Sequence, residues 1–347
     1  MAVVPAAAPR WLAGTRYARP WRAHTILLLI MLAIAVGSLM VGSYHLSLHD
    51  LWTAAIAPDP DSEATIVLWQ VRLPRLLAVA LVGGGLAVAG AAYQGLFNNP
   101  MVSPDILGAS AGSGFGAALG ILLGWHIVRI ECLAFVMGLL AVSLAWSLGA
   151  LLGRRGDPVL MLVLVGILVA SVFAALISFA KYMADPYDRL QAITYWLMGS
   201  FASINPKDVK LSALPILCGM VPLLLLRWRL NVLCMGEEEA RALGVNTRVL
   251  RFTVILAATL ISAAAVSICG MVGWIGLVVP HLARMVVGPN YRAMLPAAAF
   301  MGISFLLLVD DVARTIAALE IPIGILTALI GAPFFLFLLV HQHRREA

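Results

Sequence analysis

Ten apolar runs of near-spanning length occupy most of this chain and limit what it can fold into. A run of about 18 or more apolar residues with few charges is typical of a transmembrane helix. Backbone N–H and C=O groups in hydrocarbon must be satisfied within the protein, so a helical bundle is the default. The sequence therefore predicts an all-α integral membrane protein with ten transmembrane helices, at approximately 25–43, 76–95, 104–124, 131–152, 158–180, 211–226, 252–268, 271–287, 293–309 and 325–341.

The basic residues predict how these helices are oriented. Lys and Arg are retained on the cytoplasmic side of a membrane protein. Placing both termini inside assigns 15 of the 23 Lys and Arg residues to cytoplasmic segments. The net charge of +6 therefore indicates topology rather than nucleic-acid binding. We expect a multi-pass protein with both termini in the cytoplasm.

The N-terminal region resembles a signal peptide but lacks a cleavage site. Four arginines precede the apolar run from Thr25, yet no A-x-A-like site follows it. We expect residues 1–24 to form a disordered cytoplasmic tail and residues 25–343 to form one transmembrane domain.

A short charged segment, Met235-Gly-Glu-Glu-Glu-Ala-Arg-Ala-Leu-Gly-Val245, stands out in a chain with only 12% charged residues. Two glycines bracket a predicted helical turn, and Glu237 begins it, where a negative charge complements the helix dipole. Ala240 and Leu243 are three residues apart and are expected to share a face. The orientation places this segment in the cytoplasm, where we expect it to bind a partner, although an ordinary solvated helix is an open alternative.

The sequence lacks the motifs of a nucleotide-hydrolysing or metal-binding site. A phosphate-binding loop needs a lysine after a glycine, and none of the three lysines follows one. The seven histidines form no H-E-x-x-H, and the four cysteines form no C-x-x-C. We expect no catalytic residue, no metal site and no cofactor in this chain.

One apparent catalytic motif, Gly108-Ala-Ser110-Ala-Gly112, matches the G-x-S-x-G spacing of a nucleophilic serine. It lies in an apolar segment with further glycines, where small residues let membrane helices pack closely. Helix packing is therefore the favoured interpretation. The alternative is an intramembrane serine protease that uses Ser110 with His281 from another span.

Polar residues at the ends of the predicted spans are the better guide to function, because polar groups are costly at membrane depth. Arg72 and Arg75 precede the second span, and Arg314 follows the ninth. These arginines either anchor the helices at the interface or contact an acidic partner on the outer face.

The polar and glycine motifs, taken in order, resemble those of FecCD-type permeases of type II ABC importers. The resemblance extends from about residue 68 to 340, and any one motif alone is weak. The motifs are Arg72-Leu-Pro-Arg75, Gly85-x4-Gly90-x3-Gln94-x4-Asn99-Pro100-x3-Pro104-x2-Leu107-Gly108, Trp196-x2-Gly199-Ser200, Gly236-Glu237-x2-Ala240-x2-Leu243-Gly244, Gly273-x2-Gly276-Leu-Val-x-Pro280-His281-x2-Arg284, Asp310-x3-Arg314, Glu320-x-Pro322-x-Gly324 and Gly331-Ala-Pro333.

The resemblance implies a fold and a set of partners. Such permeases form homodimers in the bacterial inner membrane, with a pathway between the two subunits. A separate ATPase subunit, which binds ATP and Mg²⁺, lies beneath each copy, and a periplasmic binding protein delivers the substrate.

The resemblance also implies roles for particular residues. Arg72, Arg75 and Arg314 match arginines that meet glutamates of the binding protein. The segment 235–245 matches the coupling helices that contact the ATPase, through Gly236, Glu237, Ala240, Arg241, Leu243 and Gly244. Asn99 and Met101 resemble the inner gate and Ser178 the outer gate, although a helix-terminal turn and a packing serine explain them equally well.

The substrate is the least determined feature. An iron chelate, either a ferric siderophore or haem, is expected because most permeases of this kind serve iron. Cobalamin or an oxyanion such as molybdate is the alternative. An ion-driven carrier or a passive channel is disfavoured because the spans are nearly free of charged residues.

Overall fold

The structure is a computed structural model that describes residues 20–346 except 43, 45, 154–157 and 318. Within these residues the chain is helical and contains no strand. The elements in chain order are α1 (Pro20–Met40), α2 (Leu48–Ile56), α3 (Glu63–Ile66), η2 (Val67–Arg72), α4 (Leu73–Leu96), η3 (Pro104–Leu107), α5 (Ala109–Leu122), α6 (Ile127–Leu152), α7 (Pro158–Met183), α8 (Arg189–Met198), α9 (Pro206–Leu225), α10 (Arg227–Leu233), α11 (Glu237–Ala242), α12 (Thr247–Cys269), α13 (Ile275–Val287), α14 (Tyr291–Thr315) and α15 (Ile323–Glu346).

Every predicted apolar run contains a helix, but not every helix has spanning length. Among the described residues, seven helices are long and apolar enough to cross a membrane. The other three apolar helices, α5, α13 and the apolar part of α15, are shorter. At 1.5 Å per residue the 14 residues of α5 extend only about 21 Å, less than the thickness of the hydrocarbon core. The prediction of an all-helical membrane protein is confirmed, whereas a count of ten full-length spans is not.

Two of the short helices are shortened by backbone that cannot continue a helix. The third predicted run began at residue 104, but Gly108 has φ of 85° and separates η3 from α5. The eighth began at residue 271, but Gly270 and Trp274 have φ of 72° and 71°. Positive φ is incompatible with a right-handed helix, so α13 begins only at Ile275.

The first helix begins earlier than predicted. We expected a disordered tail to residue 24, but α1 starts at Pro20. Proline is favoured in the first helical turn because its missing N–H has no intrahelical partner there. The correction therefore moves residues 20–24 into the helix, while residues 1–19 lie outside the described part of the chain.

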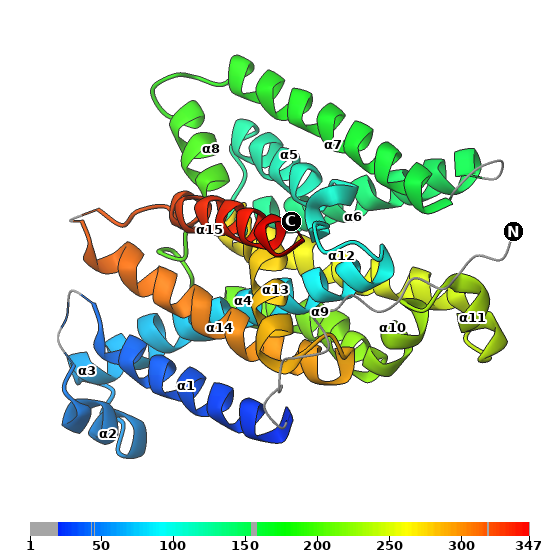
Figure 1. Ribbon diagram of the computed structural model, residues 1–347. Helices are drawn as coiled ribbons and strands as arrows, with labels where there is room; N and C mark the ends of the chain where they lie inside the picture. Colours follow the sequence, from blue (N-terminus) through cyan, green and yellow to red (C-terminus); the bar gives the residue numbers. More distant parts are fainter. Residues whose placement is uncertain (1–19, 43, 45, 154–157, 318, 347) are drawn as a thin grey trace, which may run out of the picture.

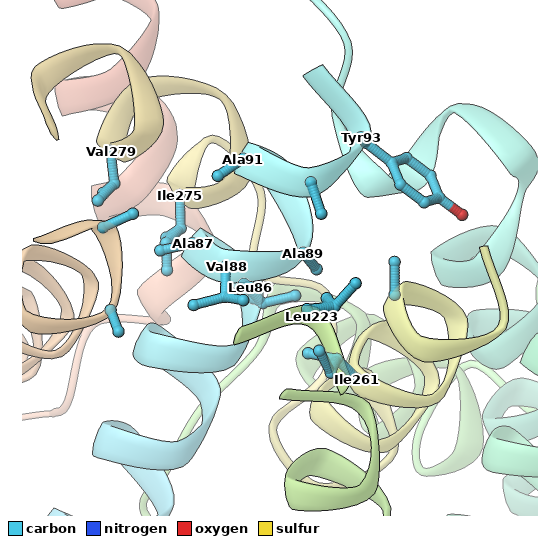
Figure 2. Close-up of a cluster of buried hydrophobic side chains, with 14 of the residues drawn as sticks. Leu86, Ala87, Val88, Ala89, Ala91, Tyr93, Leu223, Ile261, Ile275 and Val279 are labelled. Carbon is cyan, nitrogen blue, oxygen red and sulfur yellow. The ribbon is translucent and has the colours of Figure 1, made fainter. Parts of the chain in front are cut away.

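Helix α4 runs through the middle of the bundle, with α9, α12, α13 and α14 packed around it. Figure 1 shows α1, α2 and α3 along one side of the molecule and α7 and α8 along the opposite side. Every residue of α4 from Val82 to Leu96 is buried. Figure 2 shows the resulting core, in which side chains of α4 meet Leu223 of α9, Ile261 of α12 and Ile275 of α13.

Small residues make this packing possible. A methyl group on Gly90 of α4 would lie 1.9 Å from the carbonyl oxygen of Gly276 in α13. Only a residue without a side chain allows two helix backbones to come this close, as in many membrane helix pairs. The glycines of the sequence motifs therefore set the distances between helices.

Candidate functional site

Charged and polar side chains gather at two opposite ends of the bundle. We call the end that holds Arg72, Arg75 and Arg314 the arginine end. We call the end that holds α10 and α11 the α11 end. The helices α4, α12 and α14 run between the two ends.

Helix α11, inside the predicted coupling segment, is tied to the following helix α12 by a cluster of polar side chains. Glu237 of α11 accepts hydrogen bonds from Arg241 and from Arg251 of α12, each at 2.5 Å. Thr247 donates a third hydrogen bond to Glu237 at 3.1 Å. Partial burial opposes ionisation of this carboxyl, but the nearby Arg251, the Thr247 hydroxyl and Arg241 together lower its pKa. The ionised form of Glu237 therefore holds α11 against α12.

Two glycines define the ends of α11, as the sequence predicted. Gly236 precedes the helix with φ of 127°, and Gly244 follows it with φ of 77°. The N–H of Gly244 donates to the Arg241 carbonyl at 2.9 Å, and that of Val245 donates to the Ala240 carbonyl at 3.0 Å. This pair of bonds is a Schellman motif, which satisfies carbonyls at the end of a helix and favours glycine.

Ala240 and Leu243, which we expected to press together into a partner, differ in burial. Ala240 is fully buried in the core of this chain, whereas the side chain of Leu243 is 61% exposed. Leu243 is the C-cap residue of α11 and its N–H still donates to the Glu239 carbonyl at 3.0 Å, so the rest of the chain covers the Ala240 side of the helix and leaves Leu243 open. The surface that α11 presents is instead formed by Glu238, Glu239 and Leu243, all of which are exposed.

At the arginine end, Arg75 is enclosed by two carboxylates of its own chain. It donates to Asp310 of α14 at 2.8 Å and to Glu320 at 2.8 Å, using all of its guanidinium nitrogens. Its side chain is 9% exposed and that of Asp310 is 2% exposed, whereas Glu320 is 33% exposed. A buried guanidinium requires such pairing because an isolated charge is costly in a low-dielectric interior.

Arg314 and Arg72 bind the end of α1. Arg314 pairs with Asp311 and donates to the hydroxyl of Ser38 at 3.0 Å and the carbonyl of Val41 at 3.0 Å. Arg72, at 6% exposure, donates to the backbone carbonyls of Leu39 and Tyr44. Orphan carbonyls at the end of a helix commonly take such donors.

None of these three arginines is therefore free to contact a partner without giving up a contact within its own chain. Each guanidinium is largely buried and bound by groups of its own chain, while the Nε of Arg314 has no hydrogen-bond partner among the described residues. The sequence could not indicate this, because the carboxylates that cover Arg75 lie 235 and 245 residues away along the chain.

The three predicted gate residues are exposed; Asn99 and Met101 contact each other, whereas Ser178 lies on a different helix. Asn99 lies in the turn after α4, where its side-chain oxygen accepts from the N–H of Met101 at 2.9 Å. Met101 is 54% exposed. Ser178 lies on the exposed side of α7, and its hydroxyl donates to the Ala174 carbonyl one turn earlier.

Ser110 is bound to a neighbouring carboxylate rather than to a histidine. Its hydroxyl donates to Asp105 of η3. In the described part of the chain no hydrogen bond joins Ser110 to His281, and the described residues contain no group of three potential metal ligands. The contacts of Ser110 among the described residues give no support to the serine-protease alternative.

One junction of motif residues was missed by sequence reasoning. The loop after α8, the segment after α12 and the start of α15 meet at a largely buried junction. Ser200 N–H donates to the Cys269 carbonyl at 2.9 Å, and Ile323 N–H donates to the Gly199 carbonyl at 2.9 Å. The sequence motifs include Gly199-Ser200 and Gly324, but they do not indicate that these residues contact the segment at Gly270.

Comparisons with known proteins agree with this architecture. Residues 26–341 match the FecCD transport family. The molybdate import system permease protein MolB of Haemophilus influenzae is 42% identical over 313 residues, covering 89% of this chain and 92% of that protein. A probable iron chelatin transport system permease protein of Helicobacter pylori is 37% identical, covering 91% of this chain and 97% of that protein.

A solved structure described as an inward-facing ABC transporter of metal-chelate type gives a TM-score of 0.83 at 40% identity. The match covers 92% of this chain and 99% of the other. The sequence motifs, the helical bundle and these matches extend over nearly the whole chain. The chain therefore belongs to the FecCD transport family of ABC importer permeases.

Proposed function

We propose that this chain forms the transmembrane pathway of an importer that takes an iron chelate, a ferric siderophore or haem, from a periplasmic binding protein. Two copies enclose the pathway in the bacterial inner membrane, with both termini of each copy in the cytoplasm. A separate ATPase subunit beneath each copy binds ATP and Mg²⁺ and supplies the free energy. No covalent chemistry takes place on the substrate.

The observation that supports this proposal most strongly is the attachment of α11 to α12. Glu237 links the two helices through Arg241, Arg251 and Thr247. A partner that moves α11 therefore moves α12, which packs against α4 and α9 in the core. This is what a coupling helix must do, because the chain has no motor of its own and the energy must come from a partner's nucleotide cycle.

The binding protein docks at the arginine end in this proposal. Arg72, Arg75 and Arg314 supply the positive charge, and Glu320 is the partly exposed carboxylate that covers Arg75. An incoming glutamate of the binding protein competes with Glu320 for the guanidinium. The exposed residues Asn99 and Met101 line the inner opening, and Ser178 on α7 lines the outer part of the pathway.

Replacement of Leu243 by aspartate tests the coupling role. A charge at this exposed apolar position should weaken association with the ATPase by about tenfold or more, as at other interface hot spots. Leu48→Asp on α2 is the control, because Leu48 is 62% exposed and Leu243 is 61% exposed. Equal association of the two variants in a pull-down of the assembled complex would contradict the assignment.

Molybdate is a second candidate substrate, favoured by the name of the 42% identical relative. Proteoliposomes that contain the permease, its ATPase and its cognate binding protein separate the candidates. Iron-chelate uptake that depends on ATP supports the first proposal, and molybdate uptake supports the second. Uptake of cobalamin instead would contradict both.

A further inference from the structure

A cavity of about 340 Å³ opens at the α11 end between the ends of α4, α6 and α7 and the pair α11–α12. Its wall is apolar and includes Phe97, Trp146, Leu162 and Ile255. Arginines from α11 and α12 form its rim. Trp146 lies 5.9 Å from Phe252, between ring centroids. Aromatic side chains of this kind are typical of the level of lipid headgroups.

The rim carries more positive charge than the described residues neutralise. Arg241, Arg248 and Arg251 face the cavity together with one carboxylate, Glu237. That carboxylate already binds Arg241 and Arg251. Arg248 is exposed and makes no hydrogen bond or ion pair with any described residue. The Nε atom of Arg251 is buried and has no hydrogen-bond partner within the described ranges.

A second, more polar cavity of about 390 Å³ adjoins the first and shares Arg241 and Arg248 with it. Gly244, Asn246 and Thr247 complete its lining. An apolar compartment thus meets a polar one at two arginines. A ligand that fills both must have a hydrocarbon part and an anionic part.

We propose that these joined cavities bind one anionic glycerophospholipid of the cytoplasmic leaflet, with an acyl chain against Trp146 and Leu162 and the phosphate at Arg248. Arginine at the cytoplasmic boundary between transmembrane helices is suited to such headgroups, because it binds phosphate through several N–H donors.

The position of the cavity favours lipid over a protein occupant. Its apolar wall is built by α6 and α7, which are long and apolar enough to cross a membrane and expose Leu148, Leu151 and Leu152 beside it. Leu243, the exposed residue of the coupling segment that the ATPase test uses, lines neither cavity, whereas Glu237, Arg241 and Gly244 of the same segment do. The choice of the cytoplasmic leaflet rests on the orientation proposed above, whereas lipid binding itself is tested without the ATPase.

Native mass spectrometry of the folded full-length chain, titrated with phosphatidylglycerol, tests the proposal. We expect one saturable high-affinity lipid. Arg248→Gln should weaken it about fivefold, the effect of one arginine near an anionic headgroup. Arg292→Gln is the matched control, because Arg292 is an exposed arginine at the same end outside the cavity. Equal affinity in both variants would overturn the proposal.

Two further arms distinguish a lipid from a simple anion. Ala150→Phe fills the apolar compartment without changing a charge and should also weaken phosphatidylglycerol binding. Phosphatidylcholine should bind more weakly than phosphatidylglycerol, and inorganic phosphate should not compete. If inorganic phosphate competed and Ala150→Phe had no effect, the site would bind a simple anion rather than a lipid. If the two lipids bound equally, the site would not be specific for an anionic lipid.

Discussion

Buried charges at the arginine end are the residues at which a single change should cost most. Asp310 is 1% exposed and pairs with Arg75 at 2.8 Å and with Arg314 at 3.3 Å. Removing one partner of a buried pair leaves an uncompensated charge, which costs far more than the pair itself contributes. The loss of stability on replacing a charged residue therefore depends on how deeply the charge is buried rather than on whether the residue belongs to a motif.

Replacement of Asp310 by asparagine should lower the free energy of unfolding by about 3–5 kcal/mol, because Arg75 and Arg314 lose a shared carboxylate in a low-dielectric setting. Thermal unfolding in detergent measures the change. Asp61→Asn is the control, since Asp61 is exposed. An effect of Asp310→Asn no larger than that of Asp61→Asn would show that the ion pair is not needed for stability.

The Glu237 cluster should make stability depend on pH. The folded-state pKa of Glu237 lies below its ordinary value of 4.5, so its stabilisation is present above that pH and is lost as pH falls through the lower folded value. Glu237→Gln should cost about 0.5–1 kcal/mol at pH 7, because the side chain is 33% exposed. The difference between wild type and variant in unfolding midpoint should shrink below pH 4.5. A difference that is constant with pH would contradict this.

At the scale of whole elements, the contact between α4 and α13 is set by backbone rather than side chains. A methyl group at Gly90 would overlap the carbonyl carbon, carbonyl oxygen and Cα of Gly276, the nearest at 1.9 Å. Neither backbone can give way without moving a helix. The distance between these two helices therefore depends on one residue, which is why a glycine motif can specify helix packing.

Gly90→Ala should accordingly destabilise the protein by about 3 kcal/mol or more, beyond ordinary overpacking. Gly37→Ala is the matched control: Gly37 is inside α1, and an added methyl group there meets nothing within 4 Å. Alanine is a better helix former, so Gly37→Ala should stabilise by about 0.5–1 kcal/mol. The unfolding midpoints of the two variants in one detergent provide the test, and a shift in the same direction would refute it.

At the scale of the whole molecule, the arginine end and the α11 end are separate surfaces joined by α4, α12 and α14. The proposed docking of a binding protein requires a guanidinium that its own chain already pairs. Glu320 is the most exposed member of that network, so it is the group that an external carboxylate would displace. Removing the charge of Glu320 should leave the Arg75 guanidinium more available to a carboxylate of the binding protein.

Glu320→Gln should therefore strengthen binding of the cognate binding protein severalfold, because competition for Arg75 is relieved and a repulsive charge is removed. Glu63→Gln removes an exposed acidic charge near the start of the same α3–α4 segment without freeing Arg75, and separates the two effects. Surface plasmon resonance on the reconstituted permease measures both. If Glu320→Gln bound no more tightly than Glu63→Gln, Arg75 would not be a docking residue.

The sequence by itself determined the helical membrane fold, the approximate place of every apolar helix and the glycine-bounded turn at 236–244. These features are local: hydrophobic length, backbone conformation and helix-end chemistry act over a few residues. Only the tertiary structure decided that Ala240 faces inward, that Gly108 and Trp274 shorten two helices, and that Asp310 and Glu320 cover Arg75. Such contacts join residues hundreds of positions apart, and the cost of burying a charge depends on which groups the packed helices bring beside it.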